Sequence, residues 1–195
     1  MVAAPADRAD SVNLANRLTM LRILLVPAFI AALLYYTPEK NYLYFIALGI
    51  FFAACVTDGL DGYLAKKMNE TTQFGAYMDP LADKLLLLSG FLSLSLMGHL
   101  PEAMRVPAWV TIPIISRDVV ILVGSLIVFM ATGSLKAKPL FVGKMTTVAQ
   151  MSTLSLSLLM APLLLRQLFY FLALGLTVWS GALYMRMGGG MFQES

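Results

Sequence analysis

The sequence contains few of the residues that build disulfides, zinc sites or histidine clusters. Its 195 residues include one cysteine, Cys55, and one histidine, His99. A single cysteine cannot form an intramolecular disulfide, and no tetrahedral cysteine–histidine site can be assembled. Charged residues are also scarce, at 13% of the chain, against about 25% in typical soluble domains. These shortages exclude a disulfide-stabilised secreted scaffold, a disordered chain and a nucleic-acid-binding domain.

Long apolar runs dominate the chain instead. Hydrophobic residues make up 59% of it, and the stretches between charged positions approach the roughly 20 residues that a helix needs to cross a bilayer. We therefore predict an all-α polytopic membrane protein with six transmembrane helices, forming one domain over residues 1–195, with residues 1–17 as an N-terminal cytoplasmic segment and residues 186–195 as a flexible tail. The predicted spans are Leu18–Tyr36, Tyr42–Thr57, Pro80–Met97, Pro107–Ala131, Val142–Leu164 and Leu168–Met185.

The connection Asp58–Asp79 differs from the other loops. It is polar, yet it keeps Leu60, Tyr63, Leu64, Met68 and Phe74 at near-helical spacing. This pattern predicts an interfacial amphipathic helix that continues the second span on the cytoplasmic side.

The distribution of basic residues predicts the orientation in the membrane. Six spans place both termini on one side, and nine of the 14 Lys and Arg residues fall there against three on the other side. The positive-inside bias then puts both termini in the cytoplasm. We expect the membrane to be a bacterial-type inner (plasma) membrane. The nine are Arg8, Arg17, Arg22, Lys66, Lys67, Lys136, Lys138, Lys144 and Arg186, and the three are Lys40, Arg105 and Arg166.

Four of the 11 acidic residues lie in one short window. Asp58 and Asp61 are three residues apart, and Asp79 and Asp83 are four apart, so each pair shares a helix face. The predicted topology brings both pairs to the cytoplasmic side. Crowded carboxylates repel one another unless a cation neutralises them, and their oxygens suit Mg²⁺ or Mn²⁺ better than zinc. Four such ligands could hold two divalent cations about 4 Å apart.

A structural explanation exists for each aspartate singly. Asp79-Pro80 is typical of a helix start, and Asp61-Gly62 is typical of a turn. These explanations do not account for all four carboxylates in facing positions, so we favour the metal site.

The spacing of this window carries a resemblance to a known family. Residues 58–66 read Asp-Gly-Leu-Asp-Gly-Tyr-Leu-Ala-Lys, and after eight residues 75–83 read Gly-Ala-Tyr-Met-Asp-Pro-Leu-Ala-Asp. This resembles the CDP-alcohol phosphatidyltransferase signature at seven of its eight fixed positions, with Lys66 where the family usually has Arg. Lysine keeps the charge but replaces a bidentate fork with a point contact.

The resemblance implies a role for each residue of the motif. Asp58, Asp61, Asp79 and Asp83 would hold the two metals, and Asp83 would also act as the base toward the acceptor hydroxyl. The reaction would transfer the phosphatidyl group from CDP-diacylglycerol to an alcohol, releasing CMP, and the resemblance further suggests a homodimer. The candidate nucleotide-binding residues are Gly62, Ala65, Lys66 and Gly75 in the motif, with Asn16 and Thr19 before the first span.

Other basic residues are candidates for binding the acceptor or a phosphate. Arg117 lies inside the fourth span, where a charge is costly, so it either binds the acceptor phosphate or forms an internal ion pair with a carboxylate. Arg22 either reaches a diphosphate or snorkels to the interface. Lys136 and Lys138 either collect anionic head groups or only set the topology.

The identity of the acceptor is less well marked. Glycerol 3-phosphate, which gives phosphatidylglycerophosphate, is the leading choice, because the chain most resembles the branch that makes anionic glycerophospholipids and residues 143–147, Gly-Lys-Met-Thr-Thr, resemble a segment of phosphatidylglycerophosphate synthases. Those enzymes usually carry a second Arg where this chain has Ser125. The segment Ile115–Val119 resembles cardiolipin synthases of the same superfamily, which use phosphatidylglycerol. A divalent-cation transporter is the alternative from another class, although its ligands would be expected nearer the bilayer midplane.

Overall fold

The computed structural model describes residues 7–68, 73–132 and 141–191. These residues form six α-helices and one short 3-10 helix, and the described ranges contain no strand. The predicted all-α class is therefore confirmed. The chain divides into two compact units, Met1–Ser93 and Leu94–Ser195.

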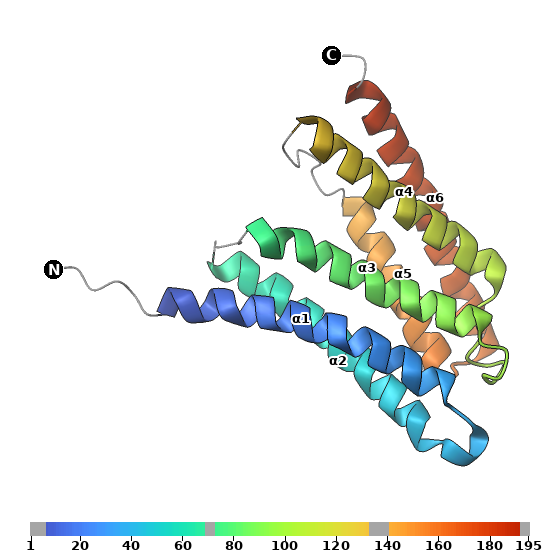
Figure 1. Ribbon diagram of the computed structural model, residues 1–195. Coiled ribbons are helices and arrows are strands. Elements are labelled where there is room, and N and C mark those ends of the chain that lie inside the picture. The colour runs from blue at the N-terminus through green and yellow to red at the C-terminus, as the bar shows by residue number, and fades with distance from the viewer. Residues whose placement is uncertain (1–6, 69–72, 133–140, 192–195) are drawn as a thin grey trace. The chain divides into compact units, whose positions relative to one another are not determined.

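Two long helices form a hairpin in the first unit. Figure 1 shows α1 and α2 running antiparallel and packed along their length, and α3 then reverses the direction of α2. Phe29 of α1 and Phe51 of α2 are both fully buried, with ring centroids 6.0 Å apart. The elements of this unit are α1 (Asp7–Leu34), η1 (Pro38–Lys40), α2 (Tyr42–Met68) and α3 (Gln73–Leu96), whose last residues belong to the second unit.

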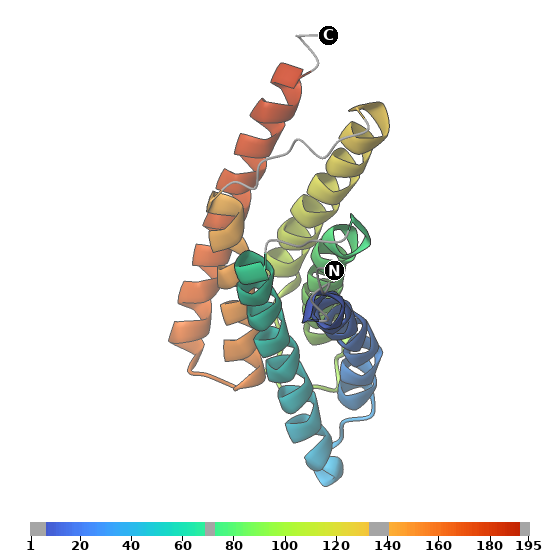
Figure 2. The same ribbon diagram turned by 90° about the vertical axis from the view of Figure 1, so that its left-hand side faces the viewer.

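Three helices form the body of the second unit: α4 (Ala108–Thr132), α5 (Phe141–Leu158) and α6 (Leu163–Met191). Helix α6 packs against both α4 and α5, and Figure 2 shows α5 and α6 side by side, joined by a tight turn. The end of the unit near this turn is closed by the loop between α3 and α4, where Leu100, Met104 and Val106 are buried.

Hydroxyl groups line the face of α5 that meets α6. The Thr146 hydroxyl lies 3.2 Å from the carbonyl of Leu176, and the Thr153 hydroxyl lies 3.3 Å from the carbonyl of Phe169. At the far end of α5, the hydroxyls of Ser157 and Tyr170 are 3.3 Å apart. Both threonines also bond the carbonyl four residues earlier in α5, so their polar groups are satisfied between the two helices.

Two predicted helix starts are wrong. Helix α1 begins at Asp7 and not at Leu18, because the polarity of residues 1–17 limits burial in a bilayer but does not prevent helix formation. Helix α3 begins at Gln73 and continues through Pro80, although a proline in a helix interior leaves one backbone carbonyl without its usual donor. The predicted start at Pro80 took this residue for the first position of a helix, where proline is common.

The turn between the last two helices is also displaced from its predicted place. Helix α5 ends at Leu158 and not at Leu164, and α6 begins at Leu163 and not at Leu168. The amide of Ala161 donates to Leu156 O at 2.9 Å and the amide of Met160 to Ser157 O at 3.1 Å, which is the Schellman pattern of a helix end. Met160 adopts φ 50° at the position that usually carries glycine, so the ordinary stop signal was missing from the sequence.

The remaining helix ends follow the predictions more closely, with one exception. Helix α2 begins at Tyr42 as predicted and runs unbroken to Met68, so the helical continuation beyond Thr57 is present. Helix α4 matches its predicted span within one residue at each end. Helix α6 extends to Met191, six residues beyond Met185, so most of the segment predicted to be a flexible tail is helical.

Apolarity and length together single out one described segment as long enough to cross a membrane, Leu163–Tyr184 of α6. Shorter apolar stretches occupy Met20–Leu34, Tyr42–Thr57 and Lys84–Leu96 in α1, α2 and α3.

Candidate functional site

The four aspartates of the motif lie on the two antiparallel helices α2 and α3. Asp61 precedes the end of α2 at Met68 by seven residues, and Asp79 follows the start of α3 at Gln73 by six. At 1.5 Å per residue these intervals are about 10 Å and 9 Å of helix, so the two pairs lie at similar distances from the connection. The side chains of Asp58, Asp61, Asp79 and Asp83 lie outside the described part of the structure.

The side chains of the predicted nucleotide-binding residues also lie outside the described part of the structure. Gly62, Ala65 and Lys66 belong to α2, Gly75 belongs to α3, and Asn16 and Thr19 belong to α1. Their side chains are not described, and Lys136 and Lys138 lie wholly outside the described residues. Among the side chains that are described, no three of His, Cys, Asp and Glu gather in one place. The roles of these residues therefore remain predictions.

Arg22, one of the candidate phosphate ligands, is described in full. It lies in the apolar part of α1 and is only 1% exposed. A snorkelling arginine would keep its guanidinium in water. Arg22 therefore does not snorkel in this structure, and its charge is held inside the protein.

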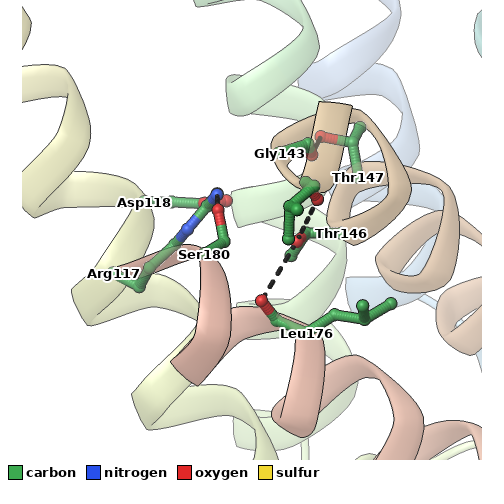
Figure 3. Close-up of polar contacts among 8 residues, drawn as sticks. Arg117, Asp118, Gly143, Thr146, Thr147, Leu176 and Ser180 are labelled. Atoms are coloured by element: carbon green, nitrogen blue, oxygen red, sulfur yellow. Dashed lines mark hydrogen bonds and ion pairs between the residues drawn. The ribbon is translucent and has the colours of Figure 1, made fainter. Parts of the chain in front are cut away.

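Arg117 is the best-described candidate, and it lies in a polar cluster built by α4 and α6 (Figure 3). Its Nη1 lies 2.6 Å from Oδ1 of Asp118, and the two side chains are only 9% and 11% exposed. Its Nη2 donates to the buried hydroxyl of Ser180 on α6. The Tyr184 ring, one turn further along α6, lies with its centroid 5.8 Å from the guanidinium carbon. The internal ion pair that the sequence offered as one explanation of Arg117 is thus present.

Two glycines lie beside this arginine. A Cβ at Gly181 of α6 would lie 3.6 Å from Cγ of Arg117, and a Cβ at Gly143 would lie 3.8 Å from its Nη2 and 3.4 Å from the Tyr184 hydroxyl. Because Gly143 is in the first turn of α5, this contact places the guanidinium next to the start of that helix. The first amides of a helix have no partner inside the helix and carry a partial positive charge. Arg117 therefore lies beside the first turn of α5, and the carboxylate of Asp118 is paired with its charge.

Ser180, Gly181 and Tyr184 were not predicted to belong to the site. Small and aromatic residues in an apolar span are ordinary packing residues, and nothing in their spacing distinguishes them. The only signal was Arg117 itself, because a charge inside a span requires polar partners on a neighbouring helix.

Comparison with known proteins decides the family. A model of the family described as CDP-alcohol phosphatidyltransferase matches residues 12–179, which include the aspartate motif, Arg117 and the first turn of α5. The chain belongs to the CDP-alcohol phosphatidyltransferase family. The predicted family and enzyme class are therefore confirmed for this CDP-alcohol phosphatidyltransferase.

Similar proteins come from several bacteria. A CDP-diacylglycerol–glycerol-3-phosphate 3-phosphatidyltransferase of Pseudomonas fluorescens is 38% identical over 187 residues, covering 89% of each chain. The protein of the same name from Haemophilus influenzae is 35% identical over 197 residues, covering 94% of this chain and 97% of the relative. A probable phosphatidylglycerophosphate synthase of Mycobacterium tuberculosis is 43% identical over 113 residues, and that match spans about half of the relative, 51%. No solved structure matches this family member.

Proposed function

We propose that this protein transfers the phosphatidyl group of CDP-diacylglycerol to glycerol 3-phosphate, forming phosphatidylglycerophosphate and CMP. The observation that carries the proposal is the similarity along nearly the whole chain to relatives that bear the corresponding name, together with a motif that departs from the family signature only at Lys66. The alternative of a cation transporter has no comparable support.

In the proposed reaction, a hydroxyl oxygen of glycerol 3-phosphate attacks the phosphorus that carries the diacylglycerol. The bond from this phosphorus to the bridging oxygen of the diphosphate breaks, and CMP leaves with that oxygen. Asp83 accepts the proton of the attacking hydroxyl as general base. Gly62, Ala65, Lys66 and Gly75, with Asn16 and Thr19 of α1, are proposed to bind the nucleotide.

The donor set fits a pair of hard divalent cations. Asp58 and Asp61 share one face of α2, and Asp79 and Asp83 share one face of α3. Aspartates at these spacings present only carboxylate oxygens, which suit Mg²⁺ or Mn²⁺. When bound, such cations would neutralise the charge that builds up on the diphosphate.

Arg117 is proposed to bind the phosphate of the acceptor. Its guanidinium is nine-tenths buried beside the first turn of α5, where the helix dipole adds to its attraction for an anion. Lys144, the next residue of α5 after Gly143, is exposed and adds positive charge at the same turn. Arg22, Lys136 and Lys138 are further candidates for contacts with phosphate.

The proposal extends to the membrane. We propose that the two units work as one phosphatidyltransferase domain whose six α-helices cross the inner membrane, with the aspartates and both termini on the cytoplasmic side. The basic residues counted above support this orientation. A homodimer is expected from the resemblance alone.

The test is an acceptor assay on the purified full-length protein in detergent–lipid micelles. CMP release from CDP-diacylglycerol is measured with glycerol 3-phosphate, with phosphatidylglycerol and with no acceptor, in Mg²⁺, in Mn²⁺ and in a chelator. We expect release with glycerol 3-phosphate and a divalent cation, and none in the chelator. CMP release with phosphatidylglycerol but not with glycerol 3-phosphate would replace this proposal with a cardiolipin synthase.

A further inference from the structure

The ion pair between Arg117 and Asp118 joins two consecutive residues of one helix. Neighbouring residues of a helix point about 100° apart and do not normally face each other. Here both side chains turn to the same side, because Nη1 of Arg117 lies 2.6 Å from Oδ1 of Asp118 while Nη2 of the same group donates to Ser180 of α6 (Figure 3).

One donor of the Arg117 guanidinium has no hydrogen-bond partner among the described residues. Asp118 takes Nη1 and Ser180 takes Nη2, whereas Nε is buried and has no hydrogen-bond partner among the residues that the structure describes. A phosphate that binds Arg117 must either displace the carboxylate of Asp118 from Nη1 or reach the buried Nε after the neighbouring side chains move. In either case it meets a guanidinium whose charge is already opposed by Asp118 at contact distance.

The pairing of Arg117 with Asp118 matters because the acceptor and the product both carry the phosphate that Arg117 is proposed to bind. In the proposed reaction the phosphate monoester of glycerol 3-phosphate does not react, so it is still present in phosphatidylglycerophosphate. A buried guanidinium without a counter-ion would hold that dianion strongly before and after the chemical step. Binding substrate and product equally tightly does not accelerate turnover, and it slows release.

We infer that the carboxylate of Asp118 competes with the acceptor phosphate for Arg117. This competition lowers the affinity of Arg117 for the phosphate and so allows the product to leave. Asp118 acts through Arg117 and is a positioning residue. The inference rests on the proposed function, in which Arg117 binds that phosphate.

The experiment compares wild type with Asp118→Asn, which keeps the size of the side chain and its acceptor oxygen but removes the charge. We expect the KM for glycerol 3-phosphate and the inhibition constant for phosphatidylglycerophosphate to fall together, each by about five- to tenfold, because a charge-assisted bond to the arginine becomes a neutral one. The KM for CDP-diacylglycerol should stay unchanged. Asp118→Glu, which keeps the charge, should stay close to wild type.

Two controls isolate the role of the pair. Glu39→Gln removes a carboxylate from the exposed helix η1 and should alter neither constant. In an Arg117→Gln background, which should raise the KM for glycerol 3-phosphate, adding Asp118→Asn should change nothing further, since Asp118 acts through the arginine.

Three results would overturn the inference: a KM that rises or stays the same in Asp118→Asn, a product inhibition constant that does not follow it, or an effect that persists without Arg117. Failure of the proposed function looks different, because the wild-type protein would then release no CMP with glycerol 3-phosphate. If Asp118→Asn does not fold, Asp118→Glu decides, since a charge at this position is predicted to preserve both constants.

Discussion

Arg166 offers the sharpest test of the packing in the second unit. It lies at the start of α6 and is 7% exposed. Its Nε donates to the carbonyl of Ala161 at 3.0 Å, in the turn that ends α5, and its Nη1 donates to the carbonyl of Glu102 at 3.5 Å, in the loop between α3 and α4. The Arg166 side chain therefore links the turn between α5 and α6 to the loop between α3 and α4. The substitution Arg166→Met keeps most of the apolar stem and removes both donors.

The expected loss of stability follows from these contacts. A hydrogen bond from a charged group contributes about 1.5–3 kcal/mol, and the 3.5 Å contact contributes less than the 3.0 Å contact. Removing the charge also removes part of the cost of burying it. We expect a net loss of about 2 kcal/mol, which corresponds to a fall in melting temperature of roughly 4–8 °C for a chain of this size.

Thermal unfolding in detergent, followed by circular dichroism, measures this change. Arg105→Met is the matched control, because the Nε of Arg105 makes a single bond to Leu100 O at 3.1 Å within its own loop and the residue is half-buried. The control should lose less stability than Arg166→Met. At 25 °C, where both variants are folded, CMP release should match wild type. A melting temperature for Arg166→Met within 1 °C of wild type, or one no lower than that of the control, would refute the reasoning.

Three further substitutions test the candidate site and the contact between α5 and α6. Asp83→Asn should abolish CMP release while CDP still raises the melting temperature in Mg²⁺, since an amide cannot accept the hydroxyl proton; full activity would remove Asp83 from the role of base. Asp61→Ala should weaken Mn²⁺ binding in a calorimetric titration, and an unchanged titration would argue against its role as ligand. Thr146→Val should lower the unfolding free energy by about 1 kcal/mol, because the buried hydroxyl that meets Leu176 O is lost; an unchanged value would mean that this contact does not stabilise the pair.

Features that depend on local sequence were predicted well. The start of α2, its continuation beyond Thr57 and both ends of α4 follow from the apolar runs and their polar borders. The aspartate motif and the family were predicted because the spacing of fixed residues is a property of the sequence alone.

Features that depend on packing were missed. Pro80 lies inside α3, and Met160 occupies a left-handed position that local preferences assign to glycine. In both cases the chain departs from the usual preference of the residue, so local preferences alone misplace the helix end. The partners of Arg117 on α6 were missed for a related reason, because Ser180 is 63 residues away in the chain and becomes a neighbour only when α4 packs against α6.

The hydroxyl-bearing face of α5 bears on how the protein is made. If α5 inserted into lipid by itself, Thr146, Thr153 and the buried amide of Gln150 would enter hydrocarbon before α6 could cover them. The neighbouring helix, in contrast, contains the described segment that is apolar enough to insert unaided. In the membrane topology proposed here, we therefore expect α5 and α6 to enter the bilayer together as a hairpin. Helix α6, which is synthesised later, would cover the polar face of α5 during insertion.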